Sequence, residues 1–124
     1  MLSGCSGRCR TLRTAACLWR EGMLHLAKND PVKAEAMQRQ ALDLIRGIGG
    51  FSVLQARIHN NIGVILSCAG RNTEANREFA TALDLLHGRV APETGLHTVI
   101  AKNYRSTLAS QHGESTQPDM ALAI

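Results

Sequence analysis

Aromatic residues are scarce in this chain, with two Phe, one Tyr and one Trp among 124 residues. Proteins that bind single-stranded nucleic acid commonly stack bases on aromatic side chains, and this chain has few to offer, although its formal net charge is +4. The sequence also lacks an apolar run of the roughly 20 residues that a membrane-spanning helix needs. We therefore expect neither a nucleic-acid partner nor a membrane span.

Metal-binding patterns are missing as well. No C-x-x-C pair and no His spacing typical of a zinc site is present. The four cysteines are Cys5, Cys9, Cys17 and Cys68, and the last two fall within predicted helices. Reduced thiols in a cytoplasmic protein are therefore favoured over a disulfide or metal framework, and we expect no cofactor.

The chain shows no convergent set of catalytic groups. The glycine-rich run 47–50 follows a predicted helix rather than a strand and lacks the Lys of a phosphate-binding P-loop. Glu35 and Glu78, together with Asp43 and Asp84, have the spacing of a solvated helix face. We therefore predict no enzyme and no catalytic residue.

What the sequence does contain is an internal repeat. The string Ala-Leu-Asp-Leu occurs at residues 41–44 and again 41 residues later at 82–85, and Gly22 matches Gly63 at the same interval. A repeat of this period made of two helices is typical of an α-solenoid, in which each helix pair buries its apolar side against its neighbours. The predicted fold is all-α: a short solenoid of antiparallel helix pairs, with about two and a half repeats and five main helices.

The repeated positions resemble the signature of the tetratricopeptide family. Its spacing is an apolar residue, Gly four positions later, Ala twelve positions after that and Ala seven further on. The residues that match are Leu18, Gly22, Ala34 and Ala41 in one copy and Gly63, Ala75, Phe79 and Ala82 in the next. His59 and Gln38 depart from the pattern. The usual period is 34 residues, and the longer one here is similar to that of kinesin-light-chain-type repeats.

Three regions follow from these patterns. Residues 1–10 are rich in Gly, Ser, Cys and Arg and show no period, so we expect a disordered leader. The repeat domain covers residues 11–113. Residues 114–124 form a flexible or short-helical tail, since so short a helix is marginal in water.

Helix starts recur once per repeat. Thr11, Ser52 and Thr94 are spaced 41 and 42 residues apart, and each has a hydroxyl that can cap a helix. Ser52 and Gln55 have the spacing of a capping box. Asp30 followed by Pro31 predicts the start of the second helix.

The resemblance implies that the first helix of each pair lines a concave groove that binds a peptide or a helix. Asn amides there can pair with a partner's backbone, Arg and Lys favour acidic side chains, and Trp and Met offer an apolar anchor. The predicted groove residues are Trp19, Arg20, Met23, Arg57, Asn60, Asn61, Val64, Lys102, Asn103 and Ser106. In an alternative interpretation, the Asn side chains bond to loop carbonyls of adjacent repeats, and the leader buries Trp19.

The leading functional hypothesis is a non-enzymatic scaffold that binds a protein or peptide, with acidic partners favoured. The chaperone-type carboxylate clamp of this family is not met, because only Asn61 fits it. A second hypothesis is a self-assembling homodimer completed through helix 95–111, whose Val99, Tyr104 and Leu108 we expect to be exposed.

The first residues leave two targeting hypotheses open. Leu2 to Cys5 resembles a bacterial lipoprotein box, which would make the chain an accessory of an envelope assembly machine if the true start lies upstream. The Arg-rich beginning, with no acid before Glu21, also resembles an organellar transit segment. The favoured location is cytoplasmic.

Overall fold

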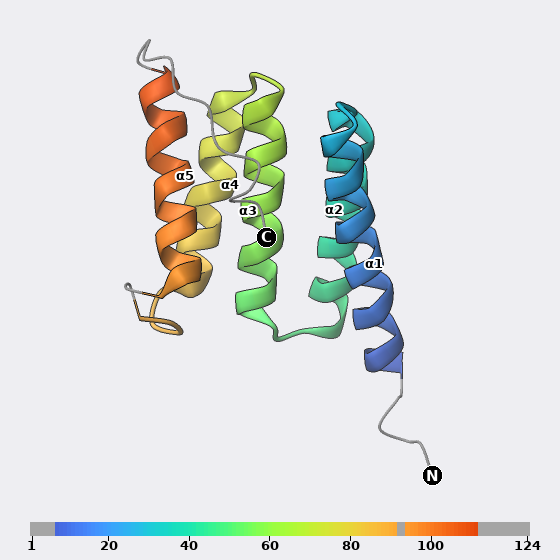
Figure 1. The fold of residues 1–124 in the computed structure, drawn as a ribbon. Coiled ribbons are helices and arrows are strands. Elements are labelled where there is room, and N and C mark those ends of the chain that lie inside the picture. Colours follow the sequence, from blue (N-terminus) through green and yellow to red (C-terminus); the bar gives the residue numbers. More distant parts are fainter. Residues whose placement is uncertain (1–6, 92–93, 112–124) are drawn as a thin grey trace.

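The structure is a computed structural model that describes residues 7–91 and 94–111. It contains α1 (Gly7–Ala27), α2 (Pro31–Ile48), α3 (Ser52–Cys68), α4 (Asn72–Leu86) and α5 (Gly95–Gln111), and no strand occurs within these ranges. Successive helices run antiparallel, with α1, α3 and α5 nearer the viewer than α2 and α4 in Figure 1. The predicted all-α solenoid of antiparallel helix pairs is confirmed.

The two matched glycines explain how each pair packs. A Cβ added at Gly63 would lie 2.5 Å from Cε1 of Phe79, so only glycine lets α4 approach α3 this closely. At Gly22 the same atom would lie 3.1 Å from the carbonyl oxygen of Ala34 and from Nε2 of Gln38. Gly costs roughly 1 kcal/mol against Ala in a helix interior, and the close helix contact offsets that cost.

The helix α3 is the centre of the core. Every residue from Ile58 to Ser67 is buried, as expected for a helix with neighbours on more than one side. Burying a Leu, Ile or Phe side chain contributes roughly 1.5–3 kcal/mol. The largest fully buried apolar side chains are Ile45, Ile58, Ile62, Val64, Ile65, Leu66, Phe79, Leu86 and Ile100.

Several predicted helix ends are confirmed. The Asp30 side chain accepts from the backbone N–H of Lys33 at 3.2 Å, and Pro31 begins α2, where no amide donor is needed. The backbone N–H of His97 donates to Thr94 Oγ1 at 3.3 Å at the start of α5. Gly70, two residues after the end of α3, has φ +80°, a left-handed conformation that commonly ends helices.

Two other helix starts were predicted wrongly. Thr11 lies inside α1, which begins at Gly7, so the disordered leader is wrong for residues 7–10. In this segment the guanidinium of Arg8 lies 5.4 Å from the centre of the Phe51 ring, a tertiary contact between α1 and the connection before α3. Residues 1–6 and the predicted tail 114–124 lie outside the described ranges.

Ser52 is not the cap of α3. Phe51 takes the N-cap position with left-handed backbone angles, φ 58° and ψ 40°, and has no side-chain hydrogen bond to offer. Gln55 does not complete a capping box, because its Nε2 donates to the carbonyl oxygen of Gly50 at 2.9 Å. The capping box that the spacing of Ser52 and Gln55 predicted is therefore not formed, and Gln55 instead bonds to the glycine-rich connection before α3.

Candidate partner-binding face

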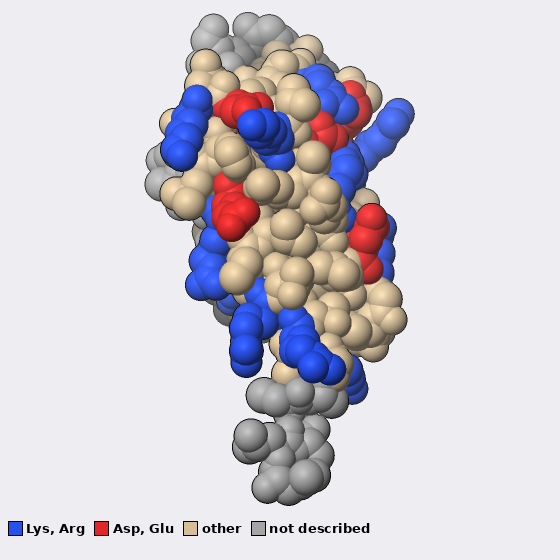
Figure 2. All heavy atoms as spheres, turned by 90° about the vertical axis from the view of Figure 1, so that its right-hand side faces the viewer, with Lys and Arg blue, Asp and Glu red and all other residues tan. Residues whose placement is uncertain are grey.

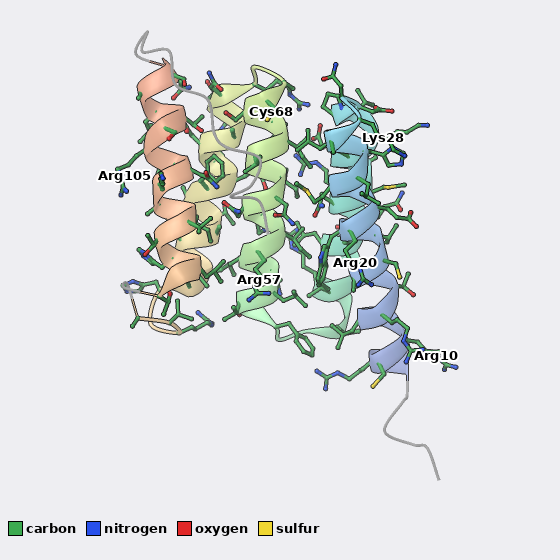
Figure 3. All side chains as sticks on the ribbon, in the orientation of Figure 1. Arg10, Arg20, Lys28, Arg57, Cys68 and Arg105 are labelled. Carbon is green, nitrogen blue, oxygen red and sulfur yellow. The ribbon has the colours of Figure 1, made fainter. Side chains whose placement is uncertain are left out.

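The helices α1, α3 and α5 form one face of the molecule, which we call the first-helix face. Figure 3 views it directly and labels Arg20 on α1 and Arg57 on α3. Six of the ten predicted groove residues reach the surface there. Arg20, Arg57 and Lys102 are exposed, and Trp19, Met23 and Ser106 are half-buried.

The other four predicted residues, Asn60, Asn61, Val64 and Asn103, are fully buried. Asn103 Nδ2 donates to Asn60 Oδ1 at 3.0 Å, a buried bond from α5 to α3. The predicted open row of amides is therefore wrong for Asn60 and Asn103, because these two side chains bond to each other between adjacent repeats. The alternative interpretation anticipated such bonds, but to loop carbonyls rather than to an amide.

Negative charge is unevenly distributed between the two rows of helices. α3 and α5 contain no Asp or Glu, and α1 contains only Glu21. The helices behind them carry the remaining helical acids, which are Glu35, Asp43, Glu74, Glu78 and Asp84. The cations of α3 and α5 therefore have no carboxylate on their own helices to neutralise them.

A buried polar cluster between α2, α3 and α4 was missed from the sequence. His59 Nδ1 lies 2.8 Å from Glu78 Oε1, and His59 Nε2 lies 3.3 Å from Arg46 Nη2. A guanidinium can only donate, so Nε2 accepts and Nδ1–H donates to Glu78. The signal for this cluster was His59 itself, a polar residue at a position where an apolar one is usual.

A second set of ion pairs extends this cluster. Glu35 accepts from Arg39 Nε at 2.9 Å and from Arg71 Nη1 at 2.7 Å, and Arg71 Nη2 also donates to Glu74 at 2.6 Å. The two bonds from Arg71, to Glu74 and to Glu35, raise the pKa of Arg71. The same bond from Arg71 lowers the pKa of Glu74.

The expectation of a fully solvated acidic face is therefore wrong for two residues. The side chains of Glu35 and Glu78 are only 18% and 17% exposed, because stacking of the repeats turns both towards neighbouring cations. Asp43 and Asp84 are exposed as expected. Both paired acids lie on α2 and α4, behind the first-helix face.

The remaining chemistry of the described residues is sparse. No group of three or more His, Cys, Asp or Glu side chains that could hold a metal ion occurs there. Cys17 and Cys68 are free thiols, and partial burial raises the pKa of Cys68. Within the same residues, no helix combines the length and the apolar character needed to cross a bilayer.

The apolar stripe predicted on α5 is also corrected. Val99, Tyr104 and Leu108 are half-buried rather than exposed, and Tyr104 packs against the buried core. Leu2 to Cys5, the basis of the lipoprotein hypothesis, lies outside the residues that the structure describes.

Comparison with known proteins supports one assignment. The model of the tetratricopeptide repeat family matches residues 13–86, more than half of the chain and the span from α1 to the end of α4. Neither a curated protein nor a solved structure matches the chain. Repeats of this family generally form non-enzymatic scaffolds that mediate protein–protein interaction. The chain belongs to the tetratricopeptide repeat family.

Proposed function

We propose that this chain is a non-enzymatic scaffold that binds an acidic segment of a partner protein on its first-helix face. The family generally mediates protein–protein interaction, and the proposal specifies the binding face and the acidic character of the partner. The observation that carries it is the lack of any Asp or Glu on α3 and α5. Each of these helices carries an exposed cation, Arg57 on α3 and Lys102 on α5.

Positive charge on this face is available to a partner. Arg57 and Lys102 form no ion pair with any residue in the described ranges. Arg39 and Arg71, by contrast, are both paired with Glu35. A partner carboxylate that accepts from a guanidinium makes a charge-assisted hydrogen bond, about twice as strong as a neutral one. An acidic segment is therefore the ligand that this face favours.

Apolar contact would come from α1. Trp19 and Met23 are half-buried, so each still offers part of its side chain to a partner. They lie four residues apart, which places them on one side of the helix. Large side chains of this kind commonly carry much of the binding energy at an interface, while the charges around them select the partner.

The test is binding to an array of synthetic peptides of equal length that are rich in Glu and Leu, in Gln and Leu, or in Lys and Leu. The chain should favour the Glu peptides, and Arg57→Glu combined with Lys102→Glu should weaken this binding by tenfold or more. The matched control is Lys33→Glu combined with Arg77→Glu, two exposed cations on α2 and α4 whose reversal should change little. Equal binding to all three peptide classes, or an equal loss in the control, would contradict the proposal.

A further inference from the structure

A row of exposed cations follows the outer side of α1. Arg10, Arg13, Arg20 and Lys28 are all exposed, and Leu24 among them is 59% exposed. Multiples of three and four residues separate these positions, so they lie on one side of the helix. We call these five residues the α1 outer stripe. It spans roughly 27 Å at about 1.5 Å per residue, and Figure 3 shows Arg10, Arg20 and Lys28 along it.

One acid lies on the same side of α1: Glu21 is exposed, three residues before Leu24 and seven before Lys28, so the stripe has four cations against one carboxylate in the described structure. None of its four cations pairs with a carboxylate there, and Arg20 Nη2 lies 3.9 Å from Sγ of Cys17. Figure 2 views this side, and towards the end where α1 begins its described surface shows Lys and Arg but no Asp or Glu. The charge is also locally unfavourable, because the first turn of a helix carries a partial positive charge of its own.

The solubility of an end repeat does not explain this pattern. An outer repeat needs a polar face, and a balanced set of charges would supply one without the net repulsion that four cations against one acid create. A second copy of the chain does not explain it either. The helix at the other end of the array, α5, carries Lys102 and Arg105 and no acid, so stacking of one copy on another would bring like charges together. The partner must bring the negative charge.

The spacing and the exposed leucine indicate what kind of partner fits. The intervals of three, seven and eight residues between the cations are irregular, so a partner with fixed charge positions would match only some of them. An anionic bilayer presents negative charge everywhere on a plane and needs no register. Leu24 offers an apolar side chain to the interface, and the stripe has no aromatic ring on which a base could stack.

We propose that the α1 outer stripe docks the molecule on an anionic lipid surface. Arg10, Arg13, Arg20 and Lys28 supply the attraction, and Leu24 inserts at the headgroup boundary. The stripe lies beside the first-helix face rather than on it, apart from Arg20 at the border. A protein partner could therefore be bound while the molecule is docked.

The experiment is flotation of the full chain with vesicles of phosphatidylcholine alone or mixed with phosphatidylserine. We expect binding to the mixed vesicles only, and loss of binding as salt is raised. Each Lys or Arg near such a surface contributes about fivefold in affinity, so the triple variant Arg10→Gln, Arg13→Gln, Lys28→Gln should bind roughly a hundredfold more weakly. Circular dichroism checks that the variant keeps its helices.

The matched control removes three exposed cations elsewhere: Lys33→Gln, Arg77→Gln and Arg105→Gln. It has the same net charge as the first triple variant and should keep most of the binding. Equal loss in both triple variants, or no binding of the unchanged chain to mixed vesicles, would overturn the proposal. So would a DNA or RNA duplex bound as tightly through the same three residues.

A single variant tests the apolar contact. Leu24→Ser should lower binding to mixed vesicles severalfold at a salt concentration where part of the electrostatic attraction is screened. An unchanged affinity would show that the side chain stays outside the interface. The stripe variants should still bind the Glu-rich peptides of the proposed function, so failure of one proposal can be told from failure of the other.

Discussion

Glu78 Oε1 lies 2.8 Å from His59 Nδ1, between the two helices of the second repeat, and the other nitrogen of that ring faces Arg46 of the first repeat at 3.3 Å. The His59 side chain is only 5% exposed. The contact therefore joins α2, α3 and α4 through one buried ring. A buried polar group that loses its partner costs more than the bond contributes when formed, so this cluster makes the packing of the repeats sensitive to single substitutions.

Glu78→Ala should lower the free energy of unfolding by about 2 kcal/mol, because it leaves His59 Nδ1–H buried without its acceptor. Glu78→Gln should cost less, since an amide oxygen can still accept from the ring. Urea denaturation measures both. Asp84→Ala on the same helix is the control, because Asp84 is exposed and should change the value by less than about 0.5 kcal/mol. Equal effects at positions 78 and 84 would show that the cluster does not stabilise the fold.

Gly63→Ala should be among the most damaging single methyl additions, because the new Cβ would meet the Phe79 ring at 2.5 Å. Overpacking of this kind typically costs about 1–3 kcal/mol. Gly22→Ala should cost less, since its nearest contacts are at 3.1 Å. Gly47→Ala in α2 is the control, with no atom within 4 Å, and should stabilise by up to about 1 kcal/mol. Thermal unfolding of the three variants should rank them in that order, and a neutral Gly63→Ala would contradict the packing described here.

Asn103→Ala should destabilise the array by about 1–3 kcal/mol, because it removes the donor to the buried Asn60 Oδ1. A double-mutant cycle with Asn60→Ala should give a coupling energy of about 1 kcal/mol for the pair. Purely additive effects would mean that the two side chains do not bond.

Acid should weaken the ion pairs around Arg71. The pKa of Glu74 is lowered by its hydrogen bond to Arg71, from an ordinary value of 4.5. A group with a lowered folded pKa stabilises the protein above its unfolded pKa, and this contribution is lost as the pH falls through the folded value. Glu74→Gln should therefore lose less stability than the unchanged chain when the pH drops from neutral to below 4.5.

The control for the acid prediction is Glu21→Gln, since Glu21 is exposed and forms no ion pair within the part of the chain that the structure describes. The unchanged chain and Glu21→Gln should show the same pH dependence in urea denaturation. If Glu74→Gln also shows it, the bond to Arg71 contributes nothing measurable.

The sequence predicted correctly the helix pairing and several helix starts. Gly22 and Gly63 recur because each pair needs a place where two helices approach closely. The period therefore predicted the pairing, and the structure shows that Phe79 is the side chain that approaches Gly63. Asp30 with Pro31, and Thr94, predicted helix starts because their capping contacts are local. Local chemistry of this kind can be recognised before any tertiary structure is known.

The face that each side chain occupies was harder to predict. Neighbouring residues on a helix point about 100° apart, so Arg57 is exposed while Ile58 and Asn60 are buried within one turn. The boundary between exposed and buried residues depends on how the next repeat stacks on the helix. The residue spacing in the sequence does not give this information. The contact between Arg8 and Phe51 is of the same kind, because it joins α1 to a connection that is distant in the sequence.

The central claim is that the first-helix face binds an acidic protein segment, and an NMR titration of the isotope-labelled chain with the Glu-rich peptide tests it most directly. The account predicts that amide shifts change along α1, α3 and α5, most strongly near Arg57 and Lys102, and little along α2 and α4. Shifts confined to α2 and α4, or no shifts at saturating peptide, would contradict it.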